Sequence, residues 1–264
     1  MGATASLSGT ALAVEPGESV DCELQVRNTG RVVDQFTFEV LGDAAPWATV
    51  EPESLSLFPD GDGTARVTFA PPRLPQTPAG AVPFAVKVVS HEDPDGTVAE
   101  EGVLEVGGFA DATAELIPRT SRGRRGGRHD LAFDNRGNQL VDAQLLASDP
   151  DNLLTFELAP ASLVAEPGTA VFSKVRVRPK HRLWRGQPAS HPFQVLVEPQ
   201  HGVPLAVDGT YLQEPVIPRW LPRALLALLA LLLLLVALWF ALLRPVVRSA
   251  ARDAVAEEVA QAEQ

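Results

Sequence analysis

The sequence predicts an all-β protein with two tandem immunoglobulin-like β-sandwiches, followed by one transmembrane α-helix. Three observations support this fold class. Short runs in which apolar and polar residues alternate are separated by glycine, proline and asparagine turns. The same series of runs occurs twice at a nearly constant spacing. An uninterrupted apolar segment follows both copies near the C-terminus.

The alternating runs are typical of strands that bury one face. Phe84, Val86 and Val88 alternate with Ala85 and Lys87, so one set of side chains points to a core and the other to solvent. We expect about seven short strands in each copy, as in an immunoglobulin-like β-sandwich. Other alternating apolar positions are Leu24, Val26, Phe36, Phe38, Val40, Val67 and Phe69 in the first copy, and Leu131, Phe133, Val175, Val177, Phe193, Val195 and Val197 in the second.

Three ordered blocks define the internal repeat. CELQVRNTGR, which begins at Cys22, matches HDLAFDNRGN, which contains Asp130. VEPESLSLFPDGDGTARVTFAP, from Val50, matches ELAPASLVAEPGTAVFSKVRVRP, from Glu157, and PFAVKV matches PFQVLV. Repeats at a fixed period indicate copies of one structural unit. We therefore predict one sandwich over residues 1–108 and a second over residues 109–215.

The segment 224–243 contains only Leu, Ala, Val, Trp and Phe. A helix of this length spans about 30 Å, the thickness of the hydrocarbon core of a bilayer. We expect a transmembrane helix over residues 221–243 and a short juxtamembrane helical tail over residues 244–264. Cationic and aromatic side chains favour the two membrane interfaces. The expected membrane-anchor residues are Arg219, Trp220, Arg223, Trp239, Phe240 and Arg244.

Two features bear on the orientation in the membrane: the lengths of chain on the two sides of the helix, and the N-terminal sequence. A 21-residue tail is easier to translocate than two folded sandwiches. The arginines on the two sides of the helix differ in number by one, with two before it and three after it, which does not decide the topology. Residues 1–14 lack the basic and apolar regions of a secretory signal. We therefore expect a single-pass protein of the cell membrane with cytoplasmic sandwiches, and the opposite topology stays open. Cys22 is the single cysteine, which excludes an internal disulfide.

The charges are unevenly distributed. Residues 1–110 contain seventeen acidic and five basic side chains, whereas residues 111–215 contain twelve of each. Such an acidic first copy argues against nucleic-acid binding. The second copy has a basic stripe made of Lys174, Arg176, Arg178, Lys180, Arg182 and Arg185. The stripe is interpreted either as a contact for an anionic leaflet or acidic partner, or as a solvated strand face. A second arginine run lies between Arg119 and Arg128.

A family resemblance follows from the motif around the repeated strands. The first copy fits a pattern that resembles bacterial immunoglobulin-like modules grouped with alpha-galactosidase-associated and adhesin-like domains. The matching residues are Asn28, Gly30, Pro52, Val67, Phe69 and Pro71. The second copy repeats it at Gly137, Pro160, Pro167, Gly168, Val175, Val177 and Pro179. Two copies before a Leu-rich helix are similar to uncharacterised actinobacterial membrane proteins, some of them associated with contractile injection systems. The resemblance implies an immunoglobulin-like fold, which hosts many activities.

No catalytic or phosphate-binding motif occurs in the sequence, and the histidines lack metal-site spacing. We therefore expect a non-enzymatic protein with no cofactor, no metal and no small-molecule substrate. The expected function is docking: the chain presents two immunoglobulin-like domains to an unidentified protein partner at the lipid bilayer. The alternative is an envelope-facing adhesin or carbohydrate-binding accessory module. Trp184 is the tryptophan outside the helix that we expect to be exposed, as a sugar platform requires.

Overall fold

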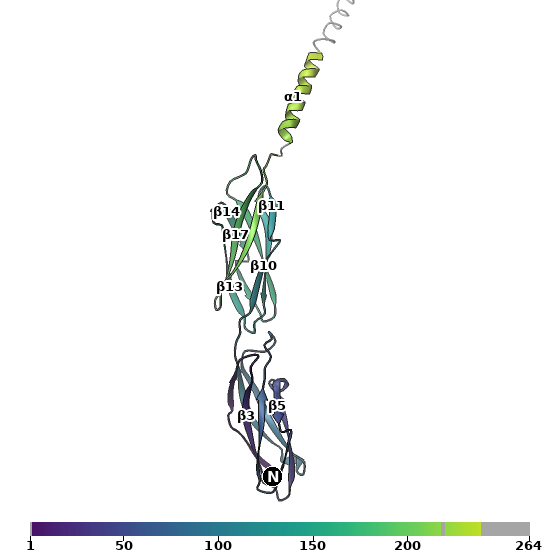
Figure 1. Ribbon diagram of the computed structural model, residues 1–264, viewed down its shortest axis with the longest axis vertical. Helices are drawn as coiled ribbons and strands as arrows, with labels where there is room; N and C mark the ends of the chain where they lie inside the picture. Colours follow the sequence, from purple (N-terminus) through teal and green to yellow (C-terminus); the bar gives the residue numbers. More distant parts are fainter. Residues whose placement is uncertain (1, 218–219, 239–264) are drawn as a thin grey trace, which may run out of the picture.

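The computed structural model describes residues 2–217 and 220–238 and contains eighteen strands, two short 3-10 helices and one α-helix in those residues (Figure 1). The first group of strands is β1 Ala3–Leu7, β2 Ala11–Val14, β3 Val20–Asn28, β4 Asp34–Gly42, β5 Ala48–Glu51, β6 Ser54–Leu57, β7 Asp62–Phe69, β8 Gly80–Ser90 and β9 Val98–Val106. The second is β10 Ala112–Ile117, β11 Thr120–Gly123, β12 Gly127–Asn135, β13 Val141–Ser148, β14 Leu154–Ala159, β15 Ser162–Ala165, β16 Ala170–Pro179, β17 Ala189–Pro199 and β18 Leu205–Gln213. The 3-10 helices are η1 Ala45–Trp47 and η2 Pro94–Gly96, and the α-helix is α1 Leu221–Leu238.

The two groups form sandwiches of identical strand order. The first sandwich has sheets β1-β3-β7-β5 and β2-β9-β8-β4-β6, and the second has β10-β12-β16-β14 and β11-β18-β17-β13-β15. The pairs β2–β9 and β11–β18 are parallel, and the other pairs are antiparallel. This arrangement is an immunoglobulin-like sandwich. Short edge strands raise the number per sandwich to nine from the expected seven.

Each sandwich encloses its own hydrophobic core. In β3, Cys22, Leu24 and Val26 are buried while the residues between them are exposed, because successive side chains of a strand point to opposite faces. The first core is built from residues of both sheets, mainly Leu24, Val26, Phe36, Val67, Phe69, Phe84, Val86, Val88 and Leu104. The second core is built mainly from Leu116, Leu131, Phe133, Leu145, Val175, Val177, Phe193, Val195, Val197 and Tyr211. Complete burial of such side chains stabilises each by about 1.5–3 kcal/mol.

An aromatic ring covers a glycine at the same place in both sandwiches. Phe84 of β8 lies opposite Gly102 of β9, and Phe193 of β17 lies opposite Gly209 of β18. A Cβ atom built on either glycine would lie 2.4 Å from the Cζ atom of the facing ring. The absence of a side chain therefore makes room for the phenylalanine on the neighbouring strand.

The junction between the sandwiches is held by polar and aromatic contacts. The Phe109 N–H donates to Asn138 Oδ1 at 2.7 Å, and Asn138 Nδ2 donates to Gly107 O at 3.1 Å. The Arg73 guanidinium of the first sandwich lies 4.3 Å from the centre of the Phe109 ring, within the range of a cation–π contact. The segment between β9 and β10 is thus fixed to the second sandwich and contacts the first.

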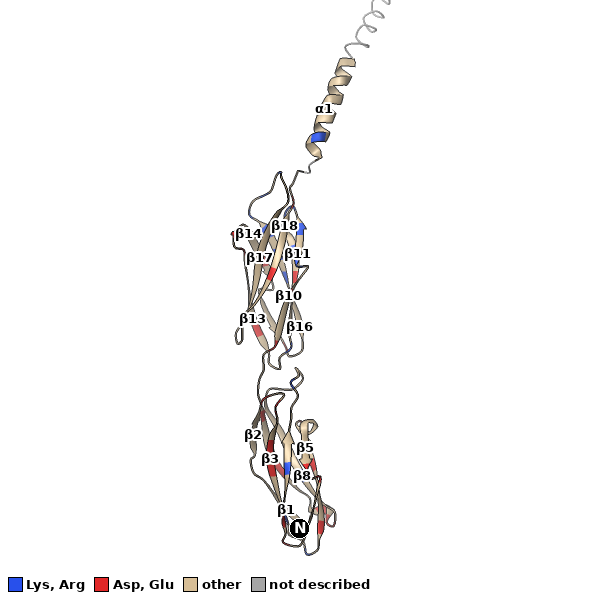
Figure 2. Cartoon of the chain, viewed as in Figure 1, with Lys and Arg blue, Asp and Glu red and all other residues tan. Residues whose placement is uncertain are grey.

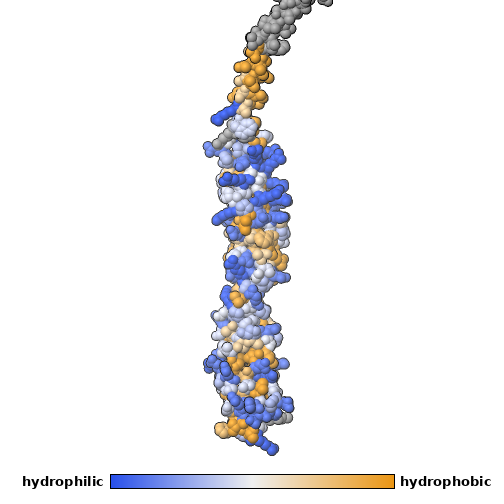
Figure 3. Space-filling view, turned by 90° about the vertical axis from the view of Figure 1, so that its right-hand side faces the viewer, coloured by the Kyte–Doolittle hydropathy of each residue, from blue (hydrophilic) through white to orange (hydrophobic). Residues whose placement is uncertain are grey.

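Helix α1 continues the chain beyond the second sandwich, and Figure 1 shows it at the end opposite the N-terminus. By length and composition it is suited to cross a membrane, and none of its residues is buried. Figure 3 shows its apolar surface above the more hydrophilic second sandwich. The expected continuation of the helix to residue 243 and the tail 244–264 lie outside the described residues.

Candidate functional site

The first three residues of the predicted basic stripe lie on strand β16. Lys174, Arg176 and Arg178 are exposed, and Val175 and Val177 between them are fully buried in the core. The alternation places the three cations on the outer face of the sheet β10-β12-β16-β14. Figure 2 shows where basic and acidic residues lie along the chain. The role of the stripe as a contact for an anionic surface stays a prediction.

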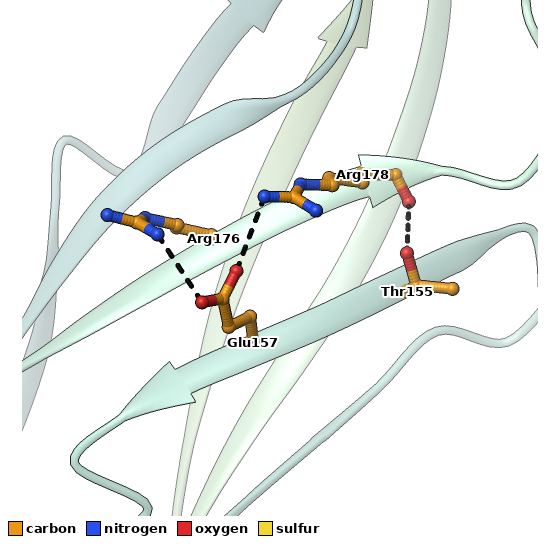
Figure 4. Close-up of polar contacts among 4 residues, drawn as sticks. All are labelled: Thr155, Glu157, Arg176 and Arg178. Atoms are coloured by element: carbon orange, nitrogen blue, oxygen red, sulfur yellow. Dashed lines mark hydrogen bonds and ion pairs between the residues drawn. The ribbon is translucent and has the colours of Figure 1, made fainter.

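Glu157 of β14, which lies outside the predicted stripe, bridges two of these cations. Its Oε1 atom lies 3.3 Å from Arg176 Nη1, and its Oε2 atom lies 3.4 Å from Arg178 Nη2 (Figure 4). Thr155 of the same strand donates a 3.1 Å hydrogen bond to the backbone oxygen of Arg178. Exposed ion pairs of this kind stabilise a fold by about 0–1 kcal/mol, so the main effect of Glu157 is to offset the charge of the stripe.

The other three predicted stripe residues leave the strand. Lys180 directly follows β16, and its Nζ atom donates to Asn152 O at 2.8 Å and to Asn152 Oδ1 at 2.5 Å. Arg182 and Arg185 are exposed residues of the loop between β16 and β17. The six residues therefore do not share one strand face. The stripe divides into an outer-face part and a loop part.

The loop between β16 and β17 is attached to the segment that leads into α1. The Val216 N–H donates to Leu183 O at 2.8 Å, and the Ile217 N–H donates to Trp184 O at 3.1 Å. Gln213, the last residue of β18, donates a 2.7 Å hydrogen bond from Nε2 to the backbone oxygen of His181 in the same loop. The Trp184 side chain is 59% exposed. This loop therefore sits where the chain leaves the sandwich for the helix.

A recess of about 610 Å³ adjoins this loop and is rich in arginine. The arginine run between residues 119 and 128 forms β11, the following turn and the start of β12, so it is part of the second sandwich rather than a linker. Two of its members meet the loop at the recess. The lining residues are Arg124, Arg125, Arg182, Trp184, Glu214 and Val216.

The first sandwich has a larger groove of about 1150 Å³. It lies where the chain leaves β5 and passes at Pro52 to β6 in the other sheet. Its lining includes the half-buried apolar side chains Phe38, Val40 and Val50. Glu51 and Glu53 are exposed at the same groove. The groove is therefore apolar at its base and predominantly acidic at its rim, where Arg66 and Glu23 also contribute.

Two of the expected membrane-anchor residues are described by the structure. Trp220 is 64% exposed and immediately precedes α1, and Arg223 lies in the first turn of the helix. The remaining expected anchor residues lie outside the described residues. They are Arg219, Trp239, Phe240 and Arg244.

Buried polar side chains have structural contacts. His129 Nδ1 donates to Pro118 O at 2.5 Å, and its Nε2 atom accepts a 2.8 Å hydrogen bond from Ser121 Oγ. Burial lowers the pKa of His129 below its ordinary value, although the backbone hydrogen bond to Pro118 and the charge of Asp130 act in the opposite direction. Burial, with a smaller effect of Asp21, raises the pKa of the Cys22 thiol. Within residues 2–217 and 220–238, no group of three or more His, Cys, Asp or Glu side chains is arranged to hold a metal ion.

Neither a known protein family nor a curated protein matches this chain by sequence. Among solved structures, the D00-D0 domain of intimin is similar over 79% of this chain and 99% of its own, with a TM-score of 0.35 and 10% identity. The chaperone YadV matches over 78% of this chain and 98% of its own, with a TM-score of 0.28 and 12% identity. A family 123 glycoside hydrolase from Clostridium perfringens matches 40% of this chain, at 10% identity and a TM-score of 0.34, and the match spans 27% of that enzyme.

Proposed function

We propose that this chain is a non-enzymatic, single-pass docking protein of the cell membrane that presents two immunoglobulin-like sandwiches to a protein partner. The observation that carries the proposal is the apolar helix α1, which has no buried residue and directly follows a folded sandwich. A bilayer would cover its leucine side chains, each favouring insertion by about 0.3–0.6 kcal/mol. The sandwiches would then be held at the membrane surface.

The groove of the first sandwich is the proposed docking surface. Strand β5 pairs with β7 on one side, and among the described residues its other side has no strand partner. Trp47 O accepts a hydrogen bond from Ala70 N, so the alternation of the antiparallel ladder directs the backbone groups of Val50 toward the open side. An open strand edge with unpaired backbone groups is suited to add a strand from another protein.

The chemistry of the groove specifies the partner segment. We propose an extended peptide segment with apolar side chains that enter beside Phe38 and Val40, and with a lysine or arginine facing Glu51 and Glu53. The excess of acidic residues in the first sandwich favours the approach of a basic segment. Main-chain hydrogen bonds would provide affinity, and the alternating side chains would provide specificity.

Site-specific photocrosslinking tests this docking surface in cells. A photoreactive residue at Thr49, which is exposed at the groove, should give one discrete adduct with the partner. The double charge reversal Glu51→Lys/Glu53→Lys should abolish that adduct. The matched control Glu18→Lys/Glu105→Lys changes two exposed carboxylates of the same sandwich away from the groove and should retain it. Loss in both variants, or in neither, would contradict the proposed groove.

We propose a cytoplasmic location for the sandwiches. The test is the protease accessibility of an N-terminal epitope tag in intact spheroplasts, with lysed cells as the control. A tag that survives until lysis supports the cytoplasmic orientation. Digestion of the tag in intact spheroplasts would contradict the cytoplasmic orientation and favour the envelope-facing alternative.

The alternative function is an adhesin or carbohydrate-binding module that faces the envelope. One observation favours it: Trp184 is an exposed residue, with 59% of its surface accessible, as a sugar-stacking platform requires. Under this alternative, the full chain would bind cell-wall polymers and Trp184→Ala would abolish the binding. Under the docking proposal, the Trp184→Ala variant would leave the crosslink at Thr49 unchanged.

A further inference from the structure

We infer that the recess at the helix-proximal end of the second sandwich binds the anionic headgroups of phospholipids in the same membrane that holds α1. Arg124, Arg125 and Arg182 would contact lipid phosphates, and Trp184 would enter the interface beside them. The inference rests on the proposed membrane anchoring, because the recess meets headgroups only when α1 lies in a bilayer. It adds a lipid-binding site on the second sandwich, whereas the docking groove lies on the first.

The loop between β16 and β17 is held near the start of α1. Ile217 N and Trp184 O are joined by a 3.1 Å hydrogen bond, and α1 begins at Leu221. Four residues extend over about 14 Å at most, so the Trp184 backbone is held close to the point where the chain would enter the bilayer. The headgroup layer on each side of a bilayer is itself several ångströms thick. A connection this short allows the recess to lie at the headgroups without any rearrangement of the sandwich.

The recess combines arginine and tryptophan, two residue types suited to a lipid interface. Arginine can bind a phosphate group through two parallel N–H···O hydrogen bonds, which suits it to phospholipid headgroups. Tryptophan is enriched at membrane interfaces because its ring is apolar while its indole N–H is polar. The structure assembles Trp184 with Arg124 and Arg125, which are about sixty residues away in the sequence. This combination is typical of an interfacial contact.

The recess is positively charged. Three arginines and one carboxylate, Glu214, line the recess, which leaves a net charge of +2. In the described part of the chain, none of these three guanidinium groups forms an ion pair, in contrast to Arg176 and Arg178, which share Glu157. A basic residue near an anionic membrane surface strengthens binding by about fivefold. The recess is thus the better-placed of the two basic surfaces for lipid.

Tryptophan quenching in nanodiscs tests the inference with the full chain. Discs would contain brominated lipids as quenchers, with either phosphatidylcholine alone or phosphatidylcholine with phosphatidylglycerol. If Trp184 lies in the interface of the anionic discs, Trp184→Phe removes quenched emission, and the quenched fraction of the fluorescence falls. If Trp184 remains in water, the same substitution removes unquenched emission, and the quenched fraction rises. The two outcomes have opposite signs, and the second would overturn the inference.

Charge variants test the arginines. Arg124→Gln/Arg125→Gln/Arg182→Gln should remove most of the difference in Trp184 quenching between anionic and zwitterionic discs. The matched control Lys174→Gln/Arg176→Gln/Arg178→Gln removes three exposed cations from the outer face of the sheet and should leave the difference unchanged. Equal loss in both variants would show that total charge, not the recess, attracts the lipid. Inorganic phosphate added to phosphatidylcholine discs should not increase Trp184 quenching. An increase as large as that caused by phosphatidylglycerol would also contradict a headgroup site.

The readout separates this inference from the proposed anchoring. Trp220 adjoins α1 and should be quenched in every variant that is inserted. A chain that separates from the discs, with no quenching of any tryptophan, would refute the anchoring itself. A chain that stays in the discs with Trp184 in water would refute the lipid site alone.

Discussion

Asn28 and Asn135 make the same three hydrogen bonds in the two sandwiches. Asn28 Nδ2 donates to Val32 O and Leu57 O, both at 2.9 Å, and its Oδ1 accepts from Gly30 N at 2.8 Å. Asn135 repeats these bonds with Gln139 O, Ala165 O and Gly137 N at 2.8, 3.0 and 3.1 Å. Both side chains are fully buried. Each asparagine ties the end of a strand in one sheet to the edge strand of the other.

Replacing either asparagine with alanine should destabilise the sandwich that contains it. Asn135→Ala leaves the Ala165 carbonyl without this buried partner, and an unsatisfied buried group costs about 1–3 kcal/mol. We expect a lower unfolding midpoint for the second sandwich by calorimetry of the full chain in detergent. Gln194→Ala removes an exposed hydrogen bond to Asp208 in the same sandwich and serves as the control. An unfolding midpoint of Asn135→Ala as high as that of the control would show that the Asn135 hydrogen bonds do not stabilise the fold.

The covered glycines should not tolerate a methyl group. Gly102→Ala places a Cβ atom 2.4 Å from Phe84 Cζ, and the ring is itself buried against Phe69, with 4.5 Å between ring centres. Overpacking of this kind destabilises a core by about 1–3 kcal/mol. Gly9→Ala, whose Cβ would lie 3.6 Å from its nearest neighbour atom, is the control. Chemical denaturation should separate the two variants. Equal stability of the two variants would show that the Phe84 ring moves aside without a cost in free energy.

The stability of the second sandwich should depend on pH through His129. Burial lowers the pKa of His129 in the folded chain, so below about 6.5 the unfolded chain binds the proton more readily than the folded chain. The free energy of unfolding should therefore be highest above that pH and should fall as the pH decreases toward the lowered folded pKa. His129→Gln should flatten this dependence between pH 5 and 7. His201→Gln, at an exposed position, should retain it.

The pairing of Glu157 with two arginines should affect surface charge more than stability. Glu157→Gln should change the free energy of unfolding by less than about 1 kcal/mol, because the pairs are exposed. At low salt it should also increase retention on a heparin column, which binds local cationic surfaces, more than Glu166→Gln, an equal charge change elsewhere on the sandwich. Equal elution of the two variants would mean that Arg176 and Arg178 are not paired with Glu157 in solution.

The fold class and most strand faces followed from the sequence because they depend on local patterns. The period of two buries Val175 and Val177 and exposes Arg176 between them, and strand pairing does not alter that alternation. The number of strands was harder to predict from the sequence. Edge strands such as β2, β6, β11 and β15 have four residues each, too few to show a clear alternation.

The candidate sites depend on contacts between distant residues, which a linear pattern does not contain. Glu157 reaches Arg176 only because β14 pairs with β16 in that register. Trp184 stood out as an exposed residue in the sequence, but its proximity to α1 results from the hydrogen bond with Ile217. The groove of the first sandwich arises where β5 ends and the chain changes sheets. Its apolar lining residues appear in the sequence as ordinary strand positions.

The central claim is that α1 anchors the protein in a membrane, and alkaline carbonate extraction of isolated membranes tests it most directly. The full chain should remain with the membrane pellet, whereas a chain that ends at Ile217 should appear in the supernatant, since both sandwiches end before that residue. Release of the full chain by carbonate would contradict the account, because it would show that the apolar helix is covered by protein rather than by lipid.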